Sequence, residues 1–524
     1  MDSSQTKASS PRRKPAFLNR VILFAAPFIL AGCGTVNLHP LTQDELARGT
    51  AADLAAARQD VEPIVGPLSL DEAIARALKY NLDRRVKMME EALALDQLDT
   101  ASWDMLPRLM AQAGYSHRNK DLITDSTDSV TGEPSLSHPY ISTARTHKTY
   151  DLGLTWNLLD FGLSYIEAKQ QADRVLIAGE RRRKAMHVLV QDVRTAFWRT
   201  VSAQKLHDQV ARTIAVAEGA LQDSEKVQAE RLRAPIDALR YQRQLLESLN
   251  LLEGIQLELD AGHIELAQLI NAPLDQDFRV EEPSDKVDTV LRDMPVKRME
   301  ELALTQNADI REQHYASRIA SEETWRTMLK LFPNLSVNFG VRHDTDSYLI
   351  NKTWNETGMQ LSWNVFNLLS ASSRKKLADA GVKLADQRRI ATQMAVLAKV
   401  HLSRLAYEAA LNQYQRADQI SRADAQIAEQ TRNRAAAETQ SKLQEVSEHT
   451  VAILSLLRRY QSLSQLQNAS GKLQATMGME PAIGSVSELS LQALTREVAT
   501  SMENWRKGVA DEVAPQVAVS AAAH

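Results

Sequence analysis

The residues whose chemistry could be catalytic or metal-binding are scattered along the chain. There are twelve histidines and a single cysteine, Cys33. No histidines lie four residues apart with a glutamate between them, the spacing that holds zinc on a helix. His117 and His343 occupy corresponding places near the ends of two expected strands, where a polar rim is favoured over a ring of metal ligands. Glycine-rich phosphate loops, nucleophile elbows and paired carboxylates are also missing, so we expect no enzyme activity, no cofactor and no metal.

The charge balance argues against binding to nucleic acid. The 524 residues include 62 basic and 66 acidic side chains, a net charge of −4. Residues 1–32 hold five of the basic side chains and one of the acidic ones, so the remainder has 57 against 65 and a charge of −8. A nucleic-acid surface needs a basic excess instead. With 19 glycines, 16 prolines and 44% hydrophobic residues, the composition is that of an ordered, helix-rich protein.

The N-terminus predicts export and lipid attachment. Basic residues at 12–14 precede the apolar run Val21–Leu30, which is too short for a membrane span of roughly 20 residues. The next residues, Leu30-Ala31-Gly32-Cys33, resemble the lipobox of bacterial lipoproteins, in which the cysteine becomes the lipidated (diacylglyceryl and palmitate) first residue. Gly34, in place of aspartate, implies delivery to the outer membrane. A small-residue cleavage site with an incidental cysteine is the alternative.

The chain contains an internal duplication of about 200 residues. Five residues near the start of each copy correspond at an offset of 226, and later ones correspond at an offset of 207. The second copy is therefore 19 residues shorter, all of them lost between two matched segments. The corresponding pairs are Asn81/Asn307, Asp83/Asp309, Pro107/Pro333, Gly114/Gly340, His117/His343, Trp156/Trp363, Asn157/Asn364 and Leu266/Leu473.

Each copy has two segments in which apolar and polar residues alternate. They lie at about 109–117, 149–158, 335–343 and 357–366. Their length and order are typical of tilted strands that cross a bilayer with one face in lipid. Tyr150, Trp156 and Trp363 would then lie at the membrane interfaces, and the polar loops at 118–148 and 344–355 would be extracellular. Two amphipathic hairpins on a soluble core are the alternative.

The rest of the sequence predicts helices. Two proline-free stretches, Leu163–Leu232 and Ala371–Arg434, would each form a helix of roughly 100 Å. Shorter single helices are expected at 69–104, 236–271, 296–330 and 439–477, with Asn271 and Gly478 as C-terminal stops.

Four strands cannot close a barrel in lipid, because open edges leave backbone groups unsatisfied. The chain must therefore oligomerise, and three copies would give twelve strands and an open lumen, whereas two would leave little lumen. The long helices must continue away from the membrane as a second, helical tube. The expected fold class is an α+β membrane protein in which four strands per chain are joined to long helices.

Several motifs resemble the TolC-like outer-membrane efflux proteins, specifically their lipoprotein branch. They are Leu70–Leu78, Leu106-Pro107, Trp156–Gly162 and Ala196-Phe197, and the similarity covers about residues 69–480. The resemblance implies a homotrimer with a twelve-stranded barrel and a helical barrel across the periplasm. It also implies docking to a periplasmic adaptor protein that is bound to an inner-membrane pump. Asn367-Leu368-Leu369 departs from the pattern, so a different strand-to-helix corner is expected there.

The periplasmic tips of the long helices are the candidate gate or adaptor contact. The segment Arg-x-Arg-Ala occurs at both expected reversals. The residues assigned to the tips are Arg231, Arg233, Asp237, Arg432, Arg434 and Glu438. A ring of arginines would repel unless some of them pair with these carboxylates. A solvated basic turn is the alternative.

Together, these expectations predict the function of the protein and the division of the chain into parts. The function is passive conduction as the outer-membrane exit duct of a tripartite efflux or type I secretion system, and a non-conducting coiled-coil lipoprotein of the envelope is the alternative. The expected parts are a signal peptide at 1–32, a lipidated tether extended along the equator at 33–68, repeats at 69–285 and 286–480, and an equatorial segment with a disordered tail at 481–524.

Overall fold

The computed structural model describes residues 38–135, 138–229, 235–282, 290–437, 442–479, 486 and 488–506. The expected signal peptide and Cys33 lie outside them. The chain divides into two units, Met1–Asp60 and Val61–His524. The first unit contains helix α2 (Gln43–Arg58), which begins with a capping box formed by Thr42 and Glu45. The expectation of an extended segment is therefore wrong for residues 43–58.

The second unit has one antiparallel sheet in the order β1-β4-β5-β6. Its strands are β1 (Arg108–His117), β4 (Thr146–Asn157), β5 (Asn334–Asp344) and β6 (Thr353–Ser362). The connection between β1 and β4 carries a small pair, β2 (Ile123–Thr124) and β3 (Tyr140–Ile141). The alternation of apolar and polar residues predicted the positions of the strands, except that β6 begins and ends about four residues earlier than predicted. The hairpin closes early because the amide of Asp344 donates to the carbonyl of Lys352.

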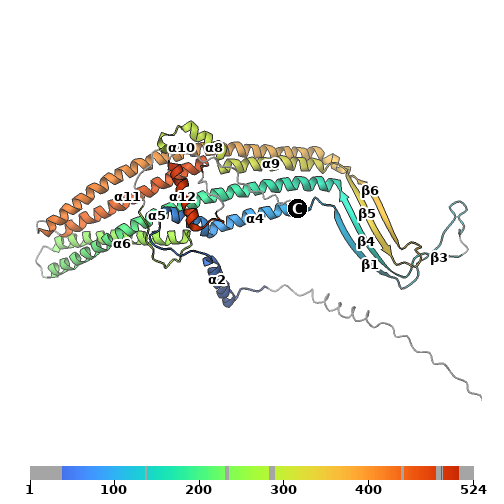
Figure 1. Ribbon diagram of the computed structural model, residues 1–524, viewed down its shortest axis with the longest axis horizontal. Helices are drawn as coiled ribbons and strands as arrows, with labels where there is room; N and C mark the ends of the chain where they lie inside the picture. The colour runs from blue at the N-terminus through green and yellow to red at the C-terminus, as the bar shows by residue number, and fades with distance from the viewer. Residues whose placement is uncertain are drawn as a thin grey trace, which may run out of the picture. The chain divides into compact units, whose positions relative to one another are not determined.

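Two long helices extend from the sheet. These are α5 (Leu158–Ala229) and α10 (Phe366–Ala436), of 72 and 71 residues. Each packs against a shorter returning helix, α6 (Pro235–Leu269) for α5 and α11 (Lys442–Met477) for α10, and α5 also packs against α11. In the second unit the sheet lies at one end and the two helical hairpins reach the other (Figure 1).

The single helices expected at 69–104 and 296–330 are each broken by an asparagine. Asn81 separates α3 (Leu70–Tyr80) from α4 (Leu82–Trp103), and Asn307 separates α8 (Val296–Gln306) from α9 (Ala308–Leu329). Both asparagines have extended backbones, and their side-chain oxygens cap the second helix of each pair. Their amide nitrogens donate to the carbonyls of Leu269, at 3.1 Å, and Thr476, at 2.9 Å. Each asparagine therefore joins a helix break to the end of a distant helix.

The returning helices stop as predicted at Asn271 and Gly478. Both residues have positive φ angles, 55° and 76°. Gly478 also lies against the backbone of Gln306, so a Cβ atom there would collide with it. Asn271 tolerates this conformation because its short polar side chain is among those that enter the left-handed region.

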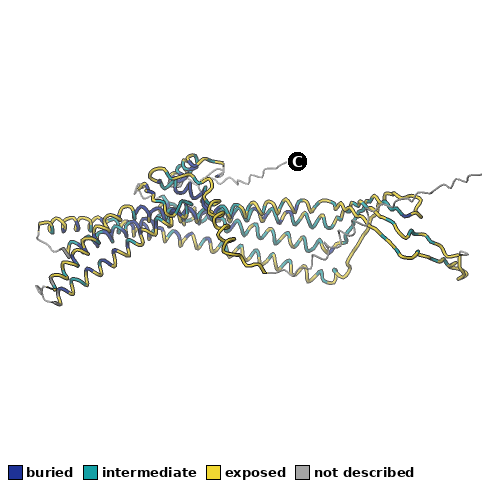
Figure 2. Tube along the Cα trace, turned by 90° about the horizontal axis from the view of Figure 1, so that it is seen from below, coloured by how far each residue is buried: buried dark blue, intermediate teal, exposed yellow. Residues whose placement is uncertain are grey.

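The largest hydrophobic core lies where short helices cover the middle of the long ones. Residues of α3, α8 and α12 (Leu491–Arg506) pack with α5 around Phe197, with α10 around Tyr407 and with α11 around Leu473. The short helix α7 (Val290–Asp293) adds Leu291. Leu68 joins the same core through hydrogen bonds on both sides of Val280. Figure 2 shows the buried residues gathered at this level, while the sheet is mostly exposed.

Candidate functional surfaces

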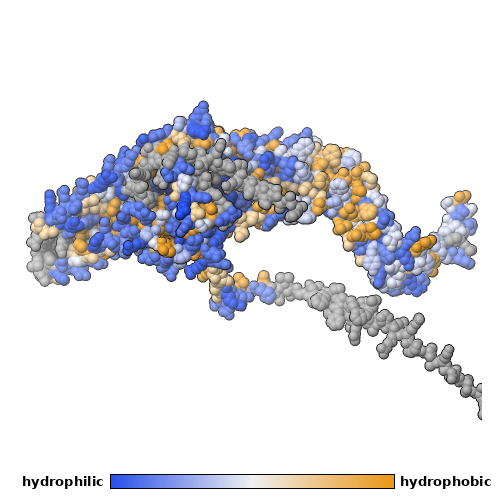
Figure 3. Space-filling view, viewed as in Figure 1, coloured by the Kyte–Doolittle hydropathy of each residue, from blue (hydrophilic) through white to orange (hydrophobic). Residues whose placement is uncertain are grey.

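The sheet has one apolar and one polar face. Leu154 of β4 lies opposite Leu109 of β1 and Phe339 of β5, and Leu152 of β4 lies opposite Val341 of β5. All five side chains are exposed. Figure 3 shows hydrophobic surface near the helix-proximal end of the sheet.

The opposite face of the sheet carries charged side chains. The Nε of Arg342 lies 3.4 Å from Oδ2 of Asp151, and its Nη1 lies 2.9 Å from Oε2 of Glu356. Since strand residues alternate between faces, these three side chains point away from the apolar ones. The sheet can therefore separate an apolar environment from water.

The three aromatic residues predicted to lie at the membrane interfaces are all exposed, and they lie at two different heights along the sheet. Tyr150 and Trp156 lie on the same face of β4, six residues apart, which is about 20 Å along a strand. Trp156 makes an edge contact with Phe161 at the start of α5. Trp363 lies just beyond β6, contrary to its expected place within the strand. Its indole donates to the carbonyl of Leu331 at 3.0 Å, which ties the chain to the end of α9 before α10 begins.

The loops at the far end of the sheet are held together by Asp346. Its Oδ1 accepts hydrogen bonds from the amides of Tyr348 and Ala144, both at 3.0 Å. The Tyr348 amide is the main cause that lowers the pKa of the Asp346 carboxyl, with smaller contributions from Ala144 and nearby cationic side chains. The long β1–β4 connection is thereby fixed to the short β5–β6 turn.

His117 and His343 lie at the closing ends of the two hairpins. The Nδ1 atoms lie 2.9 Å from Oγ1 of Thr146 and 2.8 Å from Oγ1 of Thr353. Within the described ranges, no cluster of three or more histidine, cysteine, aspartate or glutamate side chains could hold a metal ion. Each histidine thus has the same polar neighbour on the adjacent strand.

The sheet has two edges without a strand neighbour in this chain. Among the described residues, β1 pairs with β4 alone, and β6 pairs with β5 alone. Both edges are ten residues long. Unpaired backbone groups of that length are a template for pairing with another strand.

The contact between α5 and α9 is dominated by ion pairs. Arginines seven residues apart on α9, Arg311 and Arg318, bond to the nearly buried carboxylates of Glu180 and Asp173 on α5. Further pairs flank them along the same two antiparallel helices. They are Arg326–Glu167 at 2.8 Å, Arg181–Glu312 at 2.8 Å and Lys184–Asp309 at 2.7 Å. Sequence reasoning missed this ladder, although the spacing of the arginines was a signal for it.

Both α4 and α10 carry rows of exposed apolar side chains instead. On α4, Val86, Met89 and Leu93 follow each other at heptad spacing and are 54, 72 and 56% exposed. On α10, Leu377 and Leu384 are 75 and 53% exposed. Such rows are typical of helices that meet a partner helix. The heptad spacing was readable in the sequence, but which face would stay exposed was not.

The tip residues are only partly described. Arg432 and Arg434 are exposed in the last turns of α10, while Arg231, Arg233 and Glu438 lie outside the described residues. Asp237 is in the first turn of α6, and its side chain is likewise not described. Burial lowers the pKa of His449 on α11, the Glu445 carboxylate partly opposes this shift, and the Arg432 guanidinium makes a smaller contribution that lowers the pKa.

Solved structures of outer-membrane channels share this fold. The outer-membrane channel OprN matches with a TM-score of 0.59 and 17% identity over 78% of this chain and 89% of its own. The Campylobacter jejuni CmeC outer membrane channel gives 0.62 and 12%, over 82% and 89%. The Vibrio cholerae outer membrane protein VceC gives 0.57 and 13%, over 78% and 96%. This chain has the outer-membrane channel fold. The expected α+β fold of the single chain, in which four strands are joined to long helices, is thereby confirmed.

The other comparisons found no match. Neither a protein-family model nor a curated protein is similar to the sequence. Among the described residues, the helices contain no stretch that is both long and apolar enough to span a bilayer.

Proposed function

We propose that this protein is the outer-membrane exit duct of an efflux or secretion system and conducts substrates passively. The sheet, with one apolar face, one charged face and two open edges, is the observation that carries the proposal. In lipid such edges must be closed by further strands. Three copies would supply the twelve strands of an open barrel, and the long helices would continue it as a helical tube in the periplasm.

An internal duplication supports the trimer. Asn81 and Asn307 make the same two kinds of contact, and Asn271 and Gly478 end corresponding helices. By this correspondence α4 matches α9 and α10 matches α5. The α5–α9 contact inside one chain then has a counterpart between α10 of one chain and α4 of the next.

The correspondence also predicts the register of this contact between chains, here called the α4–α10 seam. Residues of α5 correspond to residues of α10 that are 207 positions later, and residues of α9 correspond to residues of α4 that are 226 positions earlier. The Asp173–Arg318 pair therefore corresponds to Ala380 and Ala92, and the Glu180–Arg311 pair corresponds to Gln387 and Arg85. In this register the exposed side chains of Met89 and Leu384 lie opposite each other. The apolar rows of α4 and α10 would thus be buried by assembly.

Three aromatic residues and Cys33 would place the protein in the outer membrane. Tyr150 on one side, and Trp156 with Trp363 on the other, would mark the two interfaces of the bilayer. Cys33, lipidated after removal of residues 1–32, would anchor the chain to the same membrane.

The tips would meet the periplasmic adaptor, with the inner-membrane pump behind it. We assign Arg231, Arg233, Arg432 and Arg434 to the gate or adaptor contact, with Asp237 and Glu438 as their partners. The exposed guanidiniums of Arg432 and Arg434 at the end of α10 support this assignment. Energy for transport would come from the pump.

Single-channel conductance in planar bilayers tests the function, with the mass in detergent measured in parallel. We expect about three times the mass of the mature chain and discrete, mostly low openings. Substitution of Arg432 and Arg434 by serine should raise the conductance if these residues narrow the entrance. A monomer that never conducts would overturn the proposal in favour of a non-conducting envelope lipoprotein.

A further inference from the structure

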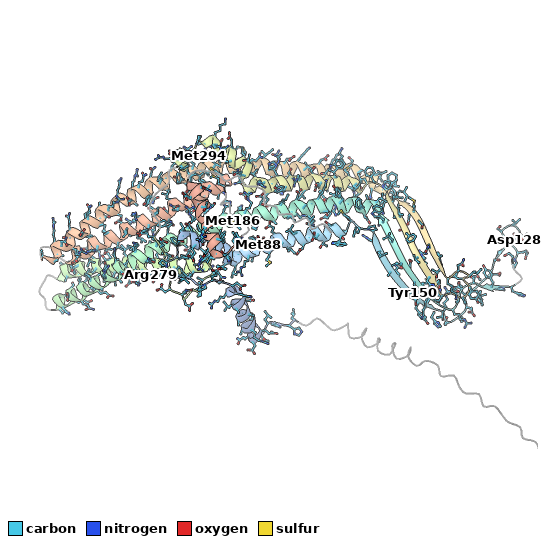
Figure 4. All side chains as sticks on the ribbon, in the orientation of Figure 1. Met88, Asp128, Tyr150, Met186, Arg279 and Met294 are labelled. Atoms are coloured by element: carbon cyan, nitrogen blue, oxygen red, sulfur yellow. The ribbon has the colours of Figure 1, made fainter. Side chains whose placement is uncertain are left out.

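Three helices of one chain, α5, α6 and α11, line a cavity of about 260 Å³. On α5 its wall includes Trp198. Figure 4 labels Met186, about three turns before Trp198 on α5, and Arg279. Next to Arg279, the backbone of Val280 bonds to the side chain of Gln204, which lies about two turns beyond Trp198. The α5 wall of the cavity therefore lies between these two levels of the helix.

Part of the cavity wall is apolar. Leu259 of α6 and Leu457 of α11 are 2 and 4% exposed, and the aromatic residues Trp198 and Tyr460 are 2 and 5% exposed. Water molecules inside a protein need two to four polar partners each, which such side chains do not supply. These four residues therefore favour an occupant that has an apolar part.

Trp198 also brings an unused hydrogen-bond donor to the cavity. Its indole Nε1 is buried and has no hydrogen-bond partner in the part of the chain that the structure describes. The corresponding residue of the second repeat, 207 positions later, is Leu405, so the repeat itself does not require an indole at this place. Buried polar groups are normally paired, and an indole N–H can only donate. The occupant should therefore also present an acceptor oxygen.

The charged side chains at the cavity already have partners. Nη1 of Arg199 donates to Oε2 of Glu265 at 2.7 Å, and Nε2 of Gln461 donates to Oε1 of Glu258 at 2.7 Å. Arg199 and Glu258, which both line the cavity, contribute one positive and one negative charge. A charged ligand would add a charge without a counter-charge, which is costly away from water. An uncharged ligand is therefore favoured.

We propose that this cavity binds a small, uncharged organic molecule that combines a ring or a short carbon chain with a hydroxyl or carbonyl oxygen. The apolar part would lie against Leu259 and Leu457, and the oxygen would accept the hydrogen bond of the Trp198 indole. This combination of an apolar wall with a few polar groups is typical of small-molecule sites. The three helices belong to one chain, so the site does not rest on the proposed duct or on assembly.

Isothermal titration calorimetry of the full-length protein in detergent tests the site with phenol and toluene. The two probes are uncharged and similar in size, but toluene lacks the oxygen. We expect saturable binding of phenol that is about tenfold tighter than that of toluene, because only phenol accepts the indole hydrogen bond. Trp198→Phe keeps an aromatic ring without the N–H, so it should bind both probes equally. Trp325→Phe makes the same change at a side chain on α9 that is 71% exposed, and it should keep the preference.

A second variant tests whether the probes occupy this cavity. Ser464 of α11 lines the cavity and is 6% exposed, so Ser464→Leu should fill the space and lose the binding of both probes. Thermal unfolding of each variant without probe verifies that it is folded. The proposal is overturned if the wild type binds neither probe saturably, which would leave a cavity that holds water only. It is also overturned if Trp198→Phe keeps the preference for phenol, or if folded Ser464→Leu binds the probes as the wild type does.

Discussion

The α5–α9 contact and the proposed α4–α10 seam, its counterpart under the proposed duplication, use opposite chemistry. Inside one chain, α5 and α9 meet through a ladder of ion pairs that includes the buried carboxylates of Glu180 and Asp173. The proposed α4–α10 seam offers exposed apolar side chains such as Met89 and Leu384 instead. Ion pairs fix a single register between helices of one chain, because each carboxylate must face its arginine. Apolar surface provides the driving force that separate chains need to associate.

The largest effect is expected from a charge placed in the α4–α10 seam. Met89→Glu would bury an unpaired carboxylate on assembly, so the mass in detergent should fall from three chains to one. Val130→Glu, in the exposed connection between β2 and β3, is the matched control and should leave the mass unchanged. A trimer that tolerates Met89→Glu would show that α4 lies outside the seam.

Removal of a carboxylate from the ladder should destabilise each chain without changing its assembly. Glu180→Gln leaves Arg183 and Arg311 close together without their shared counter-charge. We expect a loss of about 2–3 kcal/mol, measured as earlier thermal unfolding of an intact trimer. Glu90→Gln, in the solvent-exposed pair with Lys87, should have little effect. Equal midpoints for the two variants would contradict a stabilising ladder.

The two capping asparagines should have matching effects. Asn81→Ala and Asn307→Ala each remove a helix cap and a hydrogen bond to a distant carbonyl, so each should lower the stability by about 1–2 kcal/mol. Chemical unfolding of the two variants and the wild type measures this. If one of the two variants unfolded with the same free energy as the wild type, the two asparagines would not have equivalent roles, which would contradict the duplication.

The smallest effect concerns pH at the helical tip. Burial lowers the pKa of His449, so the fold favours the neutral imidazole. Its contribution to stability is complete above the ordinary histidine pKa of about 6.5 and is lost as the pH falls through the lower value of the folded state. Hydrogen exchange at the tip of the α10–α11 hairpin should therefore be faster at pH 5 than at pH 7.5, after correction for intrinsic rates. His449→Gln should remove this difference, and a variant that keeps it would assign the pH response to another group.

The sequence predicted the strands and the long helices well, because their periodicity is a local property. Leu152, Leu154 and Trp156 alternate with polar residues, and the structure has them on one face of β4. The helix breaks were missed because Asn81 and Asn307 act through distant carbonyls of Leu269 and Thr476, which no local pattern reveals.

The candidate surfaces were less predictable than the elements. The end of β6 was misplaced because Trp363 continues the alternation, although its indole bonds to Leu331 outside the sheet. The ladder between α5 and α9 depends on which helices become neighbours. The roles of the tip arginines and of Cys33 stay predictions.

A disulfide across the α4–α10 seam tests the central claim most directly. Met89→Cys and Leu384→Cys in one chain should crosslink neighbouring chains into a covalent trimer under mild oxidation, because the proposed register places these residues opposite each other. Cys33 is the single native cysteine, so each single variant controls for crosslinks through it. A ladder of covalent dimers and trimers in the double variant, and at most dimers in the single ones, is the predicted result. Failure of the double variant to crosslink in intact membranes would contradict the seam and the trimeric duct built on it.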